Sequence, residues 1–202
     1  GNTLWASGAH GQYRHDGVEW STENQGTVPI LRAVAYSQAT GLVAAGENGS
    51  VMMGGPRNWR YEDAGALSRL NAVWISPAGE IFAAGINRIF RRTDAGWVAE
   101  NTEVVEFFDV GGNADHVYAV GSDGAIRERR GTGWAGIHGV TAQDLHAVRM
   151  TSSAGYMVGT GGNIVRFDGT HWQVAYTRSN AVLWDVATVQ TRDWRALAVG
   201  DN

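Results

Sequence analysis

Short apolar runs separated by glycine and polar turns recur along the whole chain, and the clearest copy extends from Leu145 to Trp172. It opens with the apolar segment Leu145–Val148, and a second run ends at Val158–Gly159. A third run, Ile164–Phe167, leads into an Asp-Gly turn and then the Trp. Short apolar runs bounded by turn residues are typical of buried β-strands. The pattern therefore predicts a unit of short strands joined by tight turns.

Three markers repeat along the chain with one period of about 38 residues. The Trp near the end of each unit recurs at Trp20, Trp59, Trp97, Trp134 and Trp172. The apolar residue that opens each unit recurs at Leu31, Leu70, Phe107, Leu145 and Leu183. The Gly that ends the second run recurs at Gly8, Gly46, Gly85, Gly121, Gly159 and Gly200. Markers that share one period indicate a repeat architecture.

Each period contains four short β-prone segments, and no segment of the chain shows a sustained helical periodicity. Four short antiparallel strands per repeat are typical of one blade of a β-propeller, in which each blade is buried only against its neighbours. We therefore predict a single all-β propeller domain spanning residues 1–202. Its repeat units are expected at about 1–30, 31–69, 70–106, 107–144, 145–182 and 183–202.

The repeat pattern predicts the number of blades and the closure of the ring less directly than it predicts the blade itself. We expect five blades, with the first and last units completing one blade between them. However, Leu4–Gly8 and Ala196–Gly200 both occupy the position of a second strand. The alternatives are part of a six- to eight-bladed ring, or a homo-oligomer that completes the ring between chains.

Pairs of glycines three residues apart follow the second run in four of the six copies. The pairs are Gly8/Gly11, Gly46/Gly49, Gly121/Gly124 and Gly159/Gly162. Such pairs favour tight hairpins at which a positive φ is needed, because glycine adopts that conformation without steric cost.

Two segments, Arg14–Trp20 and Arg166–Trp172, resemble degenerate Asp-box turns of sialidase-type repeats. The surrounding pattern at Val120–Ile126 and Val158–Ile164 resembles the propellers of the photosystem II stability/assembly factor family. The resemblance covers nearly the whole chain and implies a propeller in which the Asp folds the turn and the Trp packs beneath it. It supports the fold and says little about activity.

The middle copies depart from that motif, since Gly55-Pro56 lacks the Asp, Asp94 is shifted by one residue and Arg130-Gly131 replaces it. Related repeats are common in exported bacterial proteins. The resemblance therefore implies a bacterial protein located outside the cytoplasm, whether secreted, periplasmic or on the cell surface. We expect the export signal to be absent from this chain.

Composition excludes several classes of function. The formal net charge is −4, without a basic block, so we expect no nucleic-acid partner. The chain has no Cys and therefore neither disulfides nor thiolate metal sites. No apolar run is long enough to span a membrane. The histidines lack the spacing of zinc ligands, and phosphate-binding fingerprints are missing, so we expect no metal and no cofactor.

An enzymatic function is not expected, and a sialidase-type glycoside hydrolase is the least favoured function. The resemblance to sialidases would require three Arg, a Tyr–Glu pair and an Asp acid, but the Tyr residues are scattered without a recognisable partner. Asp109 and Asp185 share one repeat position and are the one pair we would test for paired-carboxylate hydrolysis. The favoured interpretation is that each of these carboxylates accepts a hydrogen bond in a turn.

A binding function is therefore favoured. The candidate binding residues are those at positions that vary between otherwise constant repeats. The candidate binding residues, at the second position of the opening segment or directly after its Val, are Arg32, Asn71, Trp74, Phe108, His146, Arg149 and Trp184. Arg and aromatic residues suit recognition of a protein or a sugar. The competing interpretation is that these positions are simply unconstrained.

Two functional hypotheses follow. The favoured one is a non-catalytic interaction scaffold that presents its loops to a protein partner. The alternative is a carbohydrate-binding lectin, because tachylectin-type propellers resemble this chain in size and aromatic content. The Trp residues outside the repeat position would then stack on a glycan, and they are Trp5, Trp74, Trp184 and Trp194. A lectin predicts near-equivalent pockets in each blade, whereas these residues differ between copies, so the scaffold is favoured.

Overall fold

The computed structural model describes residues 4–8, 11–24, 29–54, 59–101, 103–152, 154–175, 179–189 and 195–201. These residues form six antiparallel sheets, each a meander of strands that are consecutive in the chain. No helix within these ranges is long and apolar enough to cross a membrane. The Gly55-Pro56 turn, His10 and Trp194 lie outside the described residues, and the side chain of Trp5 is not described.

The four complete sheets have four strands each. Their strands are β4 (Leu31–Ser37), β5 (Gly41–Gly46), β6 (Ser50–Gly54) and β7 (Arg60–Asp63); β8 (Leu70–Ile75), β9 (Ile81–Gly85), β10 (Arg88–Thr93) and β11 (Gly96–Ala99); β12 (Phe107–Gly112), β13 (Val117–Gly121), β14 (Ile126–Arg130) and β15 (Gly133–Ile137); β16 (Leu145–Met150), β17 (Gly155–Gly159), β18 (Ile164–Phe167) and β19 (Trp172–Ala175). Short 3-10 turns follow three of the second strands, namely η1 (Glu47–Gly49), η2 (Ser122–Gly124) and η3 (Thr160–Gly162).

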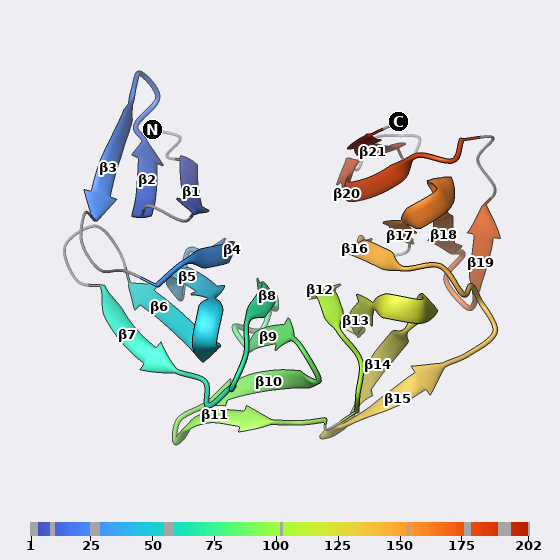
Figure 1. Ribbon diagram of the computed structural model, residues 1–202, viewed down its shortest axis with the longest axis horizontal. Coiled ribbons are helices and arrows are strands. Elements are labelled where there is room, and N and C mark those ends of the chain that lie inside the picture. Colours follow the sequence, from blue (N-terminus) through green and yellow to red (C-terminus); the bar gives the residue numbers. More distant parts are fainter. Residues whose placement is uncertain are drawn as a thin grey trace.

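The sheets are arranged around a common centre as blades (Figure 1). The first strand of each unit lies innermost, at β4, β8, β12, β16 and β20, and the fourth strand lies at the outside. The second strands of the four complete blades are buried on both faces, because neighbouring blades cover them on either side. The predicted β-propeller with four-stranded antiparallel blades is therefore confirmed.

The two ends of the chain lie in separate sheets. The first comprises β1 (Leu4–Gly8), β2 (Gly11–His15) and β3 (Trp20–Asn24), and the last comprises β20 (Val182–Val189) and β21 (Arg195–Asp201). Figure 1 shows them on opposite sides of the opening in the arc. The closure expected from the sequence, in which the two ends complete one blade, stays a prediction. As the sequence pattern indicated, β1 and β21 both occupy the second-strand position of their units.

The glycine pairs have two different structural roles. The second glycine has a positive φ in three of the pairs, at Gly49, Gly124 and Gly162, where it is +67°, as the sequence predicts. The first glycine does not, because the φ of Gly159 is −170°. Its small size is needed instead for close packing, since a Cβ at Gly159 would lie 1.8 Å from the backbone oxygen of Asp144.

The Asp-box turn before β19 folds as the resemblance implies, whereas in the first copy Asp16 folds the turn but Trp20 is 53% exposed. In the turn before β19, Oδ1 of Asp168 accepts hydrogen bonds from the backbone N–H groups of Thr170 at 2.9 Å and His171 at 2.8 Å. These bonds lower the pKa of Asp168 below its ordinary value. The following Trp172 packs into the core and is 9% exposed.

Candidate functional site

Each inner strand carries a β-bulge one residue after the apolar residue that opens its repeat. The register with the neighbouring strand shifts between the first and third residue of β4, β8, β12 and β16, and between the second and fourth residue of β20. The residues left between the paired positions are Arg32, Asn71, Phe108, His146 and Trp184. A bulge bends the strand and redirects the side chain of the extra residue. Five of the seven candidate residues therefore occupy one equivalent backbone position, at the end of each inner strand.

Three of these side chains form a continuous series of tilted ring contacts across three blades, which we call the aromatic row. The ring of Phe108 on β12 lies 5.1 Å from that of His146 on β16. The ring of His146 lies 4.5 Å from that of Trp184 on β20. Trp184 is 51% exposed, and its Nε1–H donates to Oδ1 of Asp201. The row thus ends in an exposed indole held in a defined orientation.

His146 is fixed at the centre of the row and favours its neutral form. Its Nε2 lies 3.2 Å from Oγ1 of Thr160 in η3. Burial lowers the pKa of His146 below its ordinary value, and the nearby charge of Asp144 opposes that shift only in part. A neutral imidazole between two aromatic rings favours stacking with uncharged groups over charge recognition.

The other two bulge residues make polar contacts instead. Arg32 forms an ion pair with Glu47 of η1 and is 42% exposed. The side-chain amide of Asn71 donates to Oε1 of Glu106 at 3.2 Å and to the backbone oxygen of Phe107 at 2.9 Å. Asn71 therefore joins its own blade to the next, and its contacts indicate a structural role.

The remaining two candidates, Arg149 and Trp74, lie farther along their inner strands. Arg149 forms ion pairs with Asp109 at 2.5 Å and with Asp185 at 3.0 Å. Trp74 is partly buried and stacks on Phe82, with ring centroids 6.1 Å apart. The structure therefore joins three of the seven candidates in one row and leaves the other four at separate contacts.

The one carboxylate pair considered for hydrolysis is occupied by other contacts. Oδ1 of Asp109 accepts the backbone N–H of Val110 at 2.9 Å, and Oδ1 of Asp185 accepts that of Val186 at 2.8 Å. Arg149 lies between the two carboxylates. Burial raises the pKa of Asp109, although Arg149 opposes that shift. Within the described ranges, no three His, Asp or Glu side chains gather as the ligands of a metal ion would.

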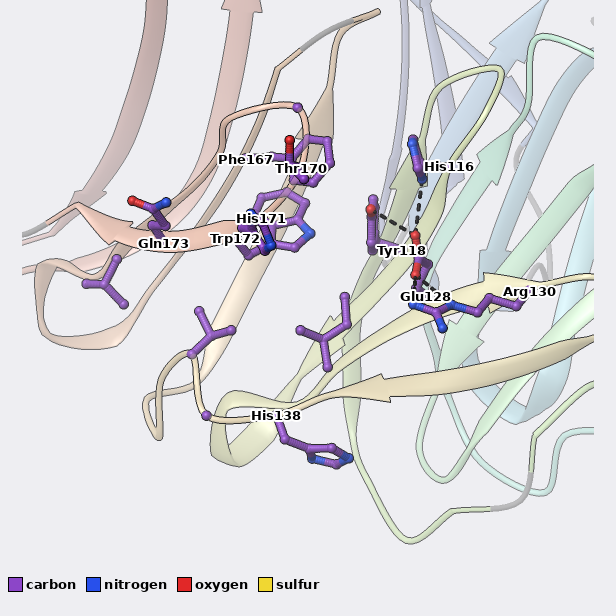
Figure 2. A pocket seen from close by; sticks show the side chains of 15 residues that line it. His116, Tyr118, Glu128, Arg130, His138, Phe167, Thr170, His171, Trp172 and Gln173 are labelled. Atoms are coloured by element: carbon purple, nitrogen blue, oxygen red, sulfur yellow. Dashed lines mark hydrogen bonds and ion pairs between the residues drawn. The ribbon is translucent and has the colours of Figure 1, made fainter.

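A cavity of about 810 Å³ lies between the β12–β15 and β16–β19 blades, and its lining comes from β13, β14 and β15 on one side and from β18 and β19 on the other. Figure 2 shows His116, Tyr118, Glu128 and Arg130 on one wall. The opposite wall comes from β18, β19 and the turn between them, and it includes Trp172. Sequence reasoning missed this site, because its residues come from neighbouring repeats and share no short motif.

Comparisons with solved structures show the same architecture. The chain superimposes on YCF48 from Cyanidioschyzon merolae with a TM-score of 0.74 at 13% identity, covering 99% of this chain and 74% of that one. This fold is a β-propeller. The similarity to the photosystem II assembly factor, which the sequence pattern suggested, is therefore confirmed at the level of structure.

Two further structures support this conclusion. YCF48 bound to D1 peptide gives a TM-score of 0.70 at 14% identity, over 94% of this chain and 68% of that one. The extracellular domain of the putative hybrid two component system BT4673 from B. thetaiotaomicron gives 0.73 at 12% identity, over 99% of this chain and 29% of that one. No family model and no curated protein matches the sequence. At these identities the likeness shows the fold alone.

Proposed function

We propose that this chain is a non-catalytic interaction scaffold that binds a protein partner at the aromatic row. The observation that carries the proposal is the stack of Phe108, His146 and Trp184, which ends in an indole that is 51% exposed. A rigid, partly exposed aromatic surface supplies large contact area at little cost in conformational entropy. The three residues differ in identity although their backbone positions are equivalent, which favours a surface specialised for one partner.

The comparison with YCF48 bound to D1 peptide supports a polypeptide ligand by analogy. A propeller of similar fold forms a complex with a peptide, so the architecture is compatible with this mode of recognition. The equivalent bulge position on β8, beside the Phe108 end of the row, carries the polar Asn71, which donates to Glu106. Polar residues at the edge of an apolar surface are usual in protein interfaces.

The contacts of Arg149 argue against a hydrolytic function for the Asp109–Asp185 pair. Paired-carboxylate hydrolysis requires one free carboxylate and one protonated acid on either side of the substrate. Here one guanidinium binds both Asp109 and Asp185, and a substrate would have to displace it. Paired-carboxylate hydrolysis at Asp109 and Asp185 is therefore not part of the proposed function.

Carbohydrate binding is the second candidate, and the exposed indole of Trp184 is the observation that favours it. Sugars stack on open aromatic faces. The neighbouring rings in the row cover part of each other, however, so only its terminal indole offers such a surface. This favours the protein ligand. The proposal also includes a location outside the cytoplasm, which cell fractionation tests.

The test is cross-linking and affinity capture from the native source, with Trp184→Ala compared with a matched variant. Tyr61→Ala is the control, because Tyr61 is similarly exposed, at 57%, but lies on the outer strand β7. We expect Trp184→Ala to weaken binding of the purified captured protein by about 10-fold or more, and Tyr61→Ala to leave it unchanged. Equal affinities of both variants would contradict the proposal. Glycan-array binding that depends on Trp184, without protein capture, would establish the lectin instead.

A further inference from the structure

A glutamate links neighbouring blades at two successive boundaries, in an arrangement that we call the carboxylate clamp. Glu62, at the end of one blade, accepts hydrogen bonds from Arg92 Nε and Trp97 Nε1 of the next, both at 2.9 Å. One boundary farther on, Glu100 accepts from Arg129 Nε at 3.0 Å and Trp134 Nε1 at 3.1 Å. Both glutamates lie three residues after the Trp of their own repeat.

The next boundary lacks the clamp. At the positions equivalent to the Glu and the Arg, the chain has Ile137 and Phe167. The Trp is retained as Trp172, which is 9% exposed. Its Nε1–H is buried, and its polar neighbour is the neutral hydroxyl of Tyr118 instead of a carboxylate. A hydrogen bond to a neutral group is weaker than one to a charged group, so this boundary lacks the strong contact of the other two.

The cavity of about 810 Å³ opens at this same boundary, and Trp172, Phe167 and Ile137 all line it. Its size is within the range of small-molecule and side-chain binding sites. The apolar positions of the missing clamp therefore form part of a cavity wall, where the other boundaries hold a buried carboxylate.

The polar groups of the cavity are mostly hydrogen-bond donors. Its one carboxylate, Glu128, is already occupied, since it contacts His116 Nδ1 at 3.1 Å, Tyr118 OH at 3.2 Å and Arg130 Nε at 2.9 Å (Figure 2). Arg130 also cancels the charge of Glu128, and its side chain is 70% exposed. His171, on the opposite wall, is exposed as well. The ligand that matches these donors is a group that accepts hydrogen bonds.

We propose that this cavity binds a carboxylate carried on a short apolar stem, which takes the place of the glutamate that closes the two preceding boundaries. The stem would pack on Ile137 and Phe167, and the carboxylate would accept from Arg130 and, once the indole edge turns toward the cavity, from Trp172 Nε1–H. Glutamate side chains of a peptide and free small dicarboxylic acids share this chemistry. The site is lined by β13, β14, β15, β18 and β19, away from the aromatic row on the inner strands, so its ligand is independent of the proposed scaffold function.

Nuclear magnetic resonance of the ¹⁵N-labelled protein tests the proposal directly. The chain has nine Trp residues, and loss of one signal in Trp172→Phe assigns the indole N–H of Trp172. Glutarate and the peptide acetyl-Ala-Glu-Ala-amide should move that signal downfield in a saturable manner. Tighter binding of the peptide identifies a polypeptide as the source of the carboxylate, and equal or tighter binding of glutarate identifies a small acid. The matching Gln peptide and maltose are controls; if either moves the signal as strongly as the carboxylates, the proposal is overturned.

Two variants test the position of the carboxylate. Ile137→Glu combined with Phe167→Arg rebuilds the clamp within the chain, so the Trp172 signal should shift without a probe and glutarate should no longer bind. Arg130→Ala keeps the apolar wall and should weaken glutarate binding about 10-fold. Arg60→Ala is the matched control, because Arg60 contacts Glu62 of an intact clamp and is 62% exposed. Unchanged glutarate binding in the rebuilt clamp, or in Arg130→Ala, would overturn the proposal, as would a Trp172 signal that no carboxylate moves.

Discussion

Oδ2 of Asp109 on β12 accepts a hydrogen bond of 2.5 Å from Nη1 of Arg149 on β16. The same oxygen accepts the backbone N–H of Val148 at 2.9 Å. Through Nη2, Arg149 also reaches Asp185 on β20 at 3.0 Å. One guanidinium therefore ties together three successive inner strands. The backbones at this point are close, since a Cβ at Gly111 would lie 2.9 Å from the backbone oxygen of Val148.

Removal of the Asp109 carboxylate should destabilise the propeller more than removal of its partner Asp185. Asp109→Ala leaves two backbone N–H groups and one side of Arg149 without an acceptor, which should lower the free energy of unfolding by about 2–4 kcal/mol. Asp185 is 56% exposed, so Asp185→Ala should cost less than about 1 kcal/mol. Urea denaturation followed by circular dichroism measures both values. Equal losses would show that the two ion pairs contribute alike.

The repeat Trp residues should differ in what their indole N–H contributes. Trp134 Nε1 donates to the buried Glu100, whereas the polar neighbour of Trp172 Nε1 is the neutral hydroxyl of Tyr118. Trp134→Phe should therefore lower the free energy of unfolding by about 1–2 kcal/mol more than Trp172→Phe, because only the first breaks a hydrogen bond to a charged group. The two variants remove the same atoms, so denaturant titrations compare them directly. A larger loss in Trp172→Phe would contradict this account.

The clamp at Glu62 should make stability depend on pH. Hydrogen bonds from Arg92, opposed by burial, lower the pKa of Glu62 below its ordinary value of 4.5. The unfolded chain then binds a proton at a higher pH than the folded chain. The stabilisation is therefore fully present above about pH 4.5 and is lost as the pH falls through the folded value.

Glu62→Gln removes that titration. At pH 7 we expect the variant to be about 2 kcal/mol less stable than the original chain, because the Gln provides no charge for Arg92. The gap in unfolding free energy should shrink as the pH is lowered below about 4.5. Urea titrations of both proteins between pH 3 and pH 7 measure it. A gap that stays constant over this range would show that the charge of Glu62 does not contribute.

The architecture was predictable because every blade is encoded by the same short pattern of Trp and apolar runs, which recurs along the chain. The spacing of Trp59, Trp97 and Trp134 reflects one packing position per blade, and the alternation of apolar runs reflects strands buried between neighbours. The bulge residues were also identifiable, since a position that varies inside a constant repeat is free of the packing that fixes its neighbours.

The candidate site was predictable only in part, because its contacts join different repeats. The stacking of Phe108 on His146 and the bridge from Arg149 to Asp185 link residues 36 to 38 positions apart. Such contacts depend on how far one blade is rotated relative to the next, and a periodic pattern contains no such information. A usable signal existed for the clamp, since Glu62 and Glu100 each follow a repeat Trp by three residues.

The last blade exposes a face that the preceding blade buries. Val158 on β17 and Val199 on β21 both precede the Gly that ends a second strand. Val158 is fully buried because Val186 and Ala198 of the last blade cover it. Val199 is 53% exposed, and Leu197 on the same strand is 68% exposed.

Because Val158 and Val199 occupy equivalent positions, the same substitution at each compares a covered face with an open one. Val158→Ala should lower the free energy of unfolding by about 2 kcal/mol, from lost burial and the cavity left behind. Val199→Ala should change it by less than about 0.5 kcal/mol if the face is open in solution. A second copy packed on β21 would instead make Val199→Ala costly and dependent on protein concentration. Light scattering decides between the two, because the monomer has a mass of 21.7 kDa and a ring completed between chains has a multiple of it.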